Sequence, residues 1–218
     1  MIKYEKNPKK VQQLSIQSVK DHVEIDHLRP AEQLIAIKML IAHGDTSILE
    51  QIKFSPDVFN DTMEVMEDNF DLLCDNESIR CGIKQKYLKN EPICLINKAS
   101  VISQAKSKKY TRSMVAVDLW KPYISDSIVV IGAESTALFR LLELLDDNHE
   151  DSIKKPALII ATPAGFSGAE QAKTRLWETC EEQGIPCIVL HGTKGGNDLA
   201  AAAINTLLKI NKEQNSKQ

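Results

Sequence analysis

The sequence lacks several features that would point to particular classes of protein. It has no run of about 18 apolar residues, so no membrane span is expected. It contains neither a Gly-x-Gly-x-x-Gly nor a Gly-x-x-x-x-Gly-Lys-Ser/Thr pattern, which argues against a dinucleotide-binding turn or a P-loop. A Gly-x-Ser-x-Gly nucleophile elbow is also missing. The net charge of −3 gives no overall basic character that would suggest a nucleic acid partner.

Cysteines are few, and their spacing suggests neither disulfides nor a metal site. There are five, an odd number, and none form a Cys-x-x-Cys pair. Cys74, Cys94 and Cys187 lie in apolar runs, which is typical of reduced thiols that act as small hydrophobes in a cytoplasmic protein. The first ten residues are polar and lysine-rich with no following apolar segment, so we expect no secretory signal.

The composition and the pattern along the chain indicate a single α/β domain over residues 1–218. Hydrophobic residues make up 43% of the sequence, which is ordinary for a globular protein. Residues 1–69 read as helical: one helix runs from Pro30 to Gly44, a short one is capped by Asp45 or Thr46, and a third starts near Ser55. From 70 to 210 short apolar runs alternate with helical stretches, and the tail 211–218 is expected to be frayed.

This alternation predicts five strands, each followed by a helix. The expected strands are 70–74, 92–96, 128–131, 157–160 and 185–190, and the expected helices are 77–83, 111–120, 136–145, 168–183 and 199–210. Apolar strands separated by helices indicate a parallel sheet that is covered on both faces, which makes three layers. Right-handed crossovers then favour a doubly wound arrangement, for which we expect the strand order 2-1-3-4-5.

Ligands of such sheets bind beyond the carboxyl ends of the strands. Polar or glycine-containing segments follow every predicted strand, at 75–76, 97, 132–136, 162–166 and 191–196. Glycines there free backbone N–H groups to approach a ligand, and helix N-termini favour anions. Arg80, Arg112, Lys173 and Lys194 can pair with carboxylates or phosphates, although a solvated surface explains most lysines equally well. The pattern therefore predicts an enzyme that binds an anionic ligand.

Among the histidines, His43 is the first candidate for chemistry. It ends the first long helix, where Gly44 can cap the helix and where a histidine is favourable near the negative end of the helix dipole. A histidine is also suited to proton transfer near neutral pH, and Asp45 is close enough to orient its ring. His191 follows the last strand and can equally contact a ligand or simply start a loop. The others lie in polar surroundings and are expected to be solvated: His22, His27 and His149.

Seven groups of residues occur in a characteristic order along the chain. They are 42–45 (Ala-His-Gly-Asp), 52–55 (Ile-Lys-Phe-Ser), 74–75 with 79–83, 111–113 (Thr-Arg-Ser), 130–132 with 136–139 and 142–144, 162–170 with Lys173, and 195–196 with 200–202. Their order and spacing resemble the precorrin-8X methylmutase family, also called the cobalt-precorrin-8 methylmutase family, of cobalamin biosynthesis. With their flanking helices they cover roughly residues 28–210, nearly the whole chain.

This resemblance implies a flavodoxin-like fold, a homodimer, and an isomerase that moves a methyl group from carbon 11 to carbon 12 of a corrin precursor. It implies no separate cofactor and no protein-bound metal, because the migrating group, and cobalt where present, belong to the substrate. The family's catalytic histidine falls on His43, which would act as a general acid that selects the substrate tautomer. The residues expected to bind the polycarboxylate substrate are Arg80, Thr111, Arg112, Ser113, Gly132, Thr136, Gly165, Phe166, Lys173, Lys194, Gly195 and Gly196.

Two segments depart from the family pattern, and each adds an acid. Residues 133–136 read Ala-Glu-Ser-Thr where Asn-Ala-Pro-Thr is common, and Asn197-Asp198 replaces the usual Ser-Pro. Two other functions stay open: a phosphate- or nucleotide-binding enzyme on the same fold, and a non-catalytic carrier of tetrapyrroles. Nucleotide binding without tetrapyrrole binding would favour the first, and a coloured complex without conversion would favour the second.

Overall fold

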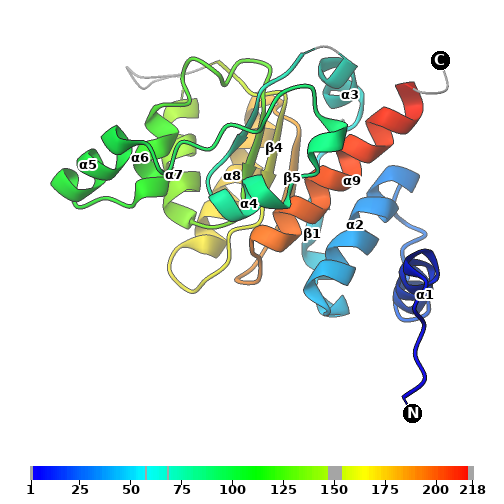
Figure 1. Ribbon diagram of the computed structural model, residues 1–218. Helices are drawn as coiled ribbons and strands as arrows, with labels where there is room; N and C mark the ends of the chain where they lie inside the picture. Colours follow the sequence, from blue (N-terminus) through cyan, green and yellow to red (C-terminus); the bar gives the residue numbers. More distant parts are fainter. Residues whose placement is uncertain (1, 57, 68, 147–153, 216–218) are drawn as a thin grey trace.

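Short apolar strands build a central sheet, which the helices enclose on both faces (Figure 1). The computed structural model describes residues 2–56, 58–67, 69–146 and 154–215, so His149 lies outside the described residues. The strands are β1 (Ile52–Phe54), β2 (Leu72–Cys74), β3 (Ile128–Ile131), β4 (Leu158–Ala161) and β5 (Cys187–Leu190). The helices are α1 (Pro8–Lys20), α2 (Pro30–His43), α3 (Asn60–Glu67), α4 (Glu77–Gly82), α5 (Ala99–Lys108), α6 (Arg112–Asp118), α7 (Ser135–Leu145), α8 (Ala169–Gln183) and α9 (Asn197–Asn215), with 3-10 turns η1 (Thr46–Gln51) and η2 (Gln85–Tyr87).

The sheet separates two hydrophobic cores. Successive residues of a strand point to opposite faces, so Leu72 joins one core and Leu73 the other. Helices α2, α3, α4 and α9 cover the first face, and α5, α6, α7 and α8 cover the second. All residues of β2, β3, β4 and β5 are buried, which explains why these four strands read as continuous apolar runs in the sequence.

The predicted strand order and the expectation of an all-parallel sheet are wrong. Strands β2, β3, β4 and β5 are parallel neighbours, but the segment 92–96 makes only a single parallel bridge, from Ile93 to Leu73. Pro92 has no N–H to donate to a ladder, and the chain turns into α5 soon after, which limits the pairing. The fifth strand is instead β1, which pairs antiparallel with β5 and makes the order β1-β5-β4-β3-β2. At three residues, it is too short for its periodicity to be seen in a segment that otherwise reads as helical.

At the N-terminus α1 lies within the segment 1–69, which reads as helical but gave no bounds for this helix, and at the C-terminus α9 is longer than the sequence pattern predicts. Helix α1 begins after Asn7, whose side chain accepts hydrogen bonds from the amides of Lys9 and Lys10, and none of its residues is buried. Helix α9 continues to Asn215, so residues 211–215 are helical rather than frayed, and Asn211 donates to the carbonyl of Met66. Across the described residues, no helix is long and apolar enough to cross a membrane.

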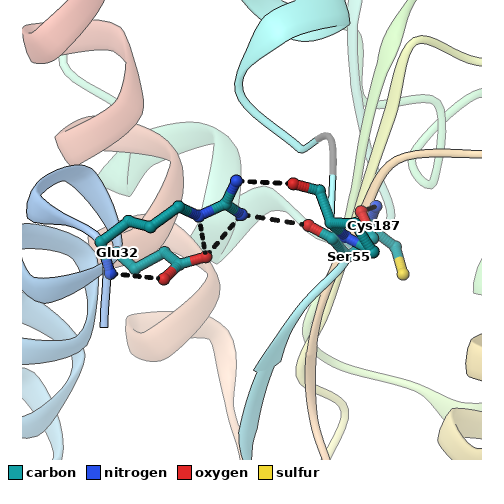
Figure 2. A network of polar contacts seen from close by, with 5 residues as sticks. Glu32, Ser55 and Cys187 are labelled. Atoms are coloured by element: carbon teal, nitrogen blue, oxygen red, sulfur yellow. Dashed lines mark hydrogen bonds and ion pairs between the residues drawn. The ribbon is translucent and has the colours of Figure 1, made fainter. Parts of the chain in front are cut away.

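A polar network ties the start of α2 to the edge of the sheet (Figure 2). The Glu32 carboxylate accepts hydrogen bonds from the backbone N–H of Arg29 at 2.8 Å and from its guanidinium at 2.6 and 2.9 Å. The same guanidinium donates to the backbone carbonyls of Pro56 at 2.6 Å and of Ser55 at 3.4 Å, just after β1. Ser55 Oγ in turn accepts the backbone N–H of Cys187 in β5 at 2.9 Å. These bonds hold the first turn of α2 against β1 and β5, which helps to set where its other end lies.

Candidate active site

The carboxyl ends of four parallel strands meet at one edge of the sheet, and α2 ends beside them. His43 is the last residue of α2, and Gly44 closes the helix in a left-handed conformation with φ of +73° and its N–H bonded to the carbonyl of Leu40. A pocket of about 390 Å³ opens here. Its lining consists of Ala42, His43, Ser78, Gly195, Gly196, Asn197, Asp198 and Leu199. The pocket therefore joins α2, α4 and the loop before α9, and it contains three of the predicted site residues.

The loop that follows β5 is locked onto the loop that follows β4. A Cβ atom on Gly195 would lie 2.1 Å from the carbonyl oxygen of Thr162, so this position has no room for a side chain. The N–H of Gly196 donates to the Thr162 carbonyl at 2.7 Å, and Thr162 Oγ1 donates to the carbonyl of Gly196 at 3.0 Å. Gly165 N–H donates to the carbonyl of Thr193 at 2.9 Å. Thr162 is buried, and its role was visible in the sequence only as a polar residue after an apolar strand.

Two predicted substrate contacts are buried in the protein. The side chain of Lys173 is fully buried, and its Nζ donates to the backbone carbonyl of Lys194 at 2.9 Å. Burial lowers the pKa of Lys173 to about 8, because the charged form loses its hydration. Ser113, on α6, is only 2% exposed. Lys173 thus supports the loop from beneath rather than offering an exposed ammonium group to a ligand, and Ser113 faces the interior.

Lys194 reaches across to the segment that follows His43. Its Nζ lies 2.5 Å from Asp45 Oδ2 and 2.6 Å from Ser47 Oγ. Lys194 and Ser47 hold the pKa of Asp45 well below its usual range, so its carboxylate is ionised. The expected contact between Asp45 and the His43 ring is not formed, because Ser47 and Lys194 occupy the carboxylate. No hydrogen bond to the His43 ring occurs among the described residues, which leaves the imidazole available to a ligand.

Asp75, directly after β2, organises the turn between β3 and α7. Its buried carboxylate accepts the backbone N–H groups of Gly132, Ala133 and Glu134 at 3.1, 3.1 and 3.2 Å. Burial raises the pKa of Asp75 to about 6, against the opposing effect of these hydrogen bonds. A Cβ on Gly132 would lie 2.8 Å from the Cβ of Ala200, so α9 approaches too closely for a side chain. The anion-binding turn predicted around Gly132 exists, but the protein's own carboxylate fills it.

The two predicted arginines are linked by a chain of hydrogen bonds. Arg112 Nη1 donates to Asn97 Oδ1 at 3.2 Å, and Asn97 Nδ2 donates to Glu77 Oε1 at 3.4 Å. Glu77 Oε2 accepts from Arg80 Nε at 2.6 Å. Arg112 is exposed and Arg80 is half-buried, so both keep guanidinium N–H groups that can reach a carboxylate outside the chain.

Thr111, Thr136, Gly165 and Phe166 complete the set of predicted contacts. Thr111 Oγ1 caps α6 by accepting the N–H of Met114, and it lies 2.7 Å from Thr136 Oγ1 at the start of α7. Gly165 has φ of +132°, a conformation that glycine adopts easily, and it precedes Phe166. Phe166 is 97% exposed, so its ring is free to cover an apolar surface. Gly165 and Phe166 lie on a loop, and Thr111 and Thr136 lie at helix starts, at the same edge of the sheet as the pocket.

His191, for which a ligand contact and a loop start are equally expected, lies beside Trp177. Its ring meets Trp177 edge to face with centroids 5.8 Å apart. Burial, with nearby Lys173 and Lys53, lowers the pKa of His191 and favours the neutral ring. In the part of the chain that the structure describes, no group of three or more His, Cys, Asp or Glu side chains could hold a metal ion.

Comparisons with known proteins identify the family of this chain. The family model described as precorrin-8X methylmutase matches residues 10–210. The precorrin-8X methylmutase of Pseudomonas aeruginosa is 31% identical over 95% of this chain and 98% of its own length, and the cobalt-precorrin-8 methylmutase of Methanocaldococcus jannaschii is 30% identical over 87% and 85%. The crystal structure of precorrin-8x methyl mutase from Thermus thermophilus superposes with a TM-score of 0.82 and 26% identity, covering 94% of this chain and 97% of that one. The chain therefore belongs to the precorrin-8X methylmutase family and is a methylmutase, an intramolecular transferase.

Proposed function

We propose that this protein moves a methyl group from carbon 11 to carbon 12 of precorrin-8 or cobalt-precorrin-8 in cobalamin biosynthesis, and that His43 is the general acid. The product is hydrogenobyrinic acid or cobyrinic acid, depending on the substrate. The observation that carries the proposal is the pocket that His43 lines together with Gly195 and Gly196 at the carboxyl edge of the sheet. Ligands of parallel sheets bind at this edge, and a histidine without a hydrogen-bond partner among the described residues is suited to exchanging a proton with one.

The reaction needs no external reagent. The bond between carbon 11 and the methyl group breaks while the bond between carbon 12 and the same methyl group forms, so atoms and electrons balance within the substrate. The imidazolium of His43 gives a proton to the conjugated ring, which selects the tautomer from which the methyl group migrates, and the proton returns afterwards. Cobalt, where present, belongs to the substrate and requires no ligands from this chain.

The charges around the edge fit a ring that carries several carboxylates. Arg80 and Arg112 lie on neighbouring loops, linked through Glu77 and Asn97, and both retain free guanidinium N–H groups. The two acids that depart from the family pattern, Glu134 and Asp198, have exposed side chains. Glu134 can therefore point into solvent while the arginines meet the substrate carboxylates, whereas Asp198 lines the pocket with His43.

The geometry also supports a homodimer in which a second copy helps to cover the substrate. A pocket of about 390 Å³ is near the small end of the roughly 300–1,000 Å³ range of ligand pockets, and a corrin precursor is a large ligand. Phe166 is almost fully exposed on a loop at the same edge. We expect sedimentation velocity to show a dimer, and a strictly monomeric, fully active enzyme would contradict this part of the proposal.

The function is tested by incubating the purified protein with the metal-free and the cobalt-containing substrate and recording absorption spectra. We expect the chromophore to shift with one of the two as the methyl group migrates. Replacing His43 by Asn should reduce turnover by about 100-fold or more, because general acid catalysis contributes roughly 10²–10⁴-fold. The matched control is His22→Asn, which changes an exposed histidine just after α1. This variant should keep full activity.

Three results would overturn the proposal. Full turnover by folded His43→Asn protein would show that His43 is not the general acid. A coloured complex that is never converted would identify a carrier of tetrapyrroles instead. Binding of nucleotides without binding of tetrapyrroles would identify a different enzyme on this fold.

A further inference from the structure

Two segments far apart in the sequence face each other across the pocket. One is the end of α2 with His43, and the other is the loop after β5 with Gly195 and Gly196. The side chain of Lys194 spans them, since its Nζ reaches Asp45 Oδ2 and Ser47 Oγ, 149 and 147 residues away along the chain. This is a direct bond between the helix end that carries His43 and the loop that forms the opposite wall.

The loop side of this connection is rigid. Fully buried Lys173 holds the backbone carbonyl of Lys194 from beneath. The next residue, Gly195, packs without a side chain against the backbone of Thr162, and Gly196 makes two hydrogen bonds to the same threonine. The backbone of Lys194 is therefore fixed relative to β4, and only its side chain extends to the neighbouring segment.

The α2 side of the connection is a tight turn that the same carboxylate organises. Asp45 Oδ1 accepts the backbone N–H of Ser47 at 2.8 Å and caps the 3-10 turn η1. Asp45 Oδ2 accepts Ser47 Oγ at 2.9 Å as well as the Lys194 ammonium. Because His43 lies only two residues before Asp45, any movement of this turn relative to the loop after β5 changes the position of the imidazole in the pocket.

We propose that Lys194 is a positioning residue rather than a substrate anchor: its ion pair with Asp45 latches the end of α2 onto the loop after β5 and holds His43 against Gly195 and Gly196. This inference rests on the proposed role of His43 and deepens it. The latch matters for rate because a displacement of about 1 Å at a reacting group can reduce a rate by roughly 100-fold. It matters little for folding, because both side chains are 40% exposed.

The test compares Lys194→Met, Asp45→Asn and the double variant with the unmutated enzyme. Asn at position 45 keeps an oxygen that can cap η1 but loses the charge that pairs with Lys194. If Lys194 is a latch, each single variant lowers kcat by about 10- to 100-fold and changes KM by less than about twofold. The double variant is then no slower than either single variant, because both break the same bond. Lys194→Arg, which can still pair with Asp45, restores most of kcat.

A matched control comes from α9. Lys209 forms an ion pair with Glu213 at 3.3 Å on an exposed surface, so Lys209→Met removes a comparable surface charge away from the pocket. It should leave kcat and KM unchanged. Circular dichroism of all variants confirms that they are folded.

Two kinetic outcomes overturn the latch. If Lys194→Met raises KM at constant kcat while Asp45→Asn does not, Lys194 anchors a substrate carboxylate. If the two single effects multiply in the double variant, the residues act independently. If the unmutated protein itself converts no corrin precursor, that result instead refutes the proposed function.

The position of His43 can also be read without turnover. The His43 imidazole signals in a proton–nitrogen spectrum, assigned with His43→Asn, should shift or broaden in Lys194→Met and in Asp45→Asn but not in Lys209→Met. Unchanged His43 signals in both variants would show that the ion pair does not position this ring.

Discussion

Asp75 offers the sharpest test of how this edge of the sheet is built. Its carboxylate is fully buried and accepts three consecutive backbone N–H groups in the turn between β3 and α7, from Gly132, Ala133 and Glu134. The informative change is Asp75→Asn, which keeps the shape of the side chain. Its amide oxygen can replace only one carboxylate oxygen, so the NH₂ group then faces at least one N–H donor that has no acceptor.

The magnitude follows from the lost acceptor and from the perturbed pKa. Leaving a buried donor unsatisfied costs about 1–3 kcal/mol, so Asp75→Asn should lower the free energy of unfolding by about 1–3 kcal/mol at pH 7.5. The pKa of Asp75 is about 6 in the folded protein and 3.8 as its ordinary value. Between these values the folded state holds a proton that the unfolded state has released. The wild type therefore gains stability over the variant as the pH falls from 6 to 4, by about 1.4 kcal/mol per pH unit.

The assay is urea unfolding of both proteins at several pH values between 7.5 and 4.5, followed by tryptophan fluorescence. We expect the difference in unfolding free energy to widen as the pH falls, in total by about 2 kcal/mol at pH 4.5. Asp198→Asn, which changes an exposed acid in the first turn of α9, should alter stability by less than about 1 kcal/mol throughout. A difference that stays constant or narrows in acid would refute the reasoning. It would mean that the three N–H groups outweigh desolvation and keep Asp75 ionised.

Two further changes probe the loop after β5. Gly195→Ala places a Cβ 2.1 Å from the Thr162 carbonyl oxygen, so we expect a loss of about 3 kcal/mol in unfolding free energy, and an unchanged urea midpoint would show that the loop simply moves away. For Lys173→Met, the wild type should gain stability over the variant as the pH rises from 8 to 10, by up to about 1.4 kcal/mol per unit. The folded state releases the Lys173 proton near pH 8, whereas the unfolded state keeps it to near 10.5. A difference between wild type and Lys173→Met that is independent of pH would contradict the desolvation of this lysine.

Much of the fold could be predicted because the relevant signals are local. The run 128–131 is strand β3 as expected, and the predicted helices at 77–83, 136–145 and 168–183 match α4, α7 and α8 to within a residue or two. Elements without a strong local signal were either missed, as α5 was, or predicted without bounds, as α1 was within the helical segment 1–69. Helix α1 has no buried residue to give it an apolar stripe, and α5 lies in a lysine-rich segment. Strand β1 exists because β5 offers it an edge, which no local pattern reports.

The residues of the candidate site also divide into those that the sequence predicted and those that it did not. His43, Gly195 and Gly196 were predicted and do line one pocket, whereas Ser78 and Asn197 from the same pocket were not predicted. Their only signal was a polar side chain near the start of a helix, which usually means a cap. Asp75 was visible as a polar residue after an apolar strand, but nothing local shows that its partners are the amides after β3.

By itself, the sequence determined the α/β class, the family and the list of residues available for chemistry, because apolar periodicity and short motifs are properties of neighbouring residues. Only the tertiary structure decided what those residues do. Lys173 and Lys194 both read as cations available to an anion, yet one is buried beneath the loop and the other is paired with Asp45. Burial and pairing depend on which segments pack together, over a separation of 21 residues between Lys173 and Lys194 and of 149 residues between Lys194 and Asp45. Burial and pairing change the free energy of the charged form of each side chain. They therefore decide which group is available to bind a ligand.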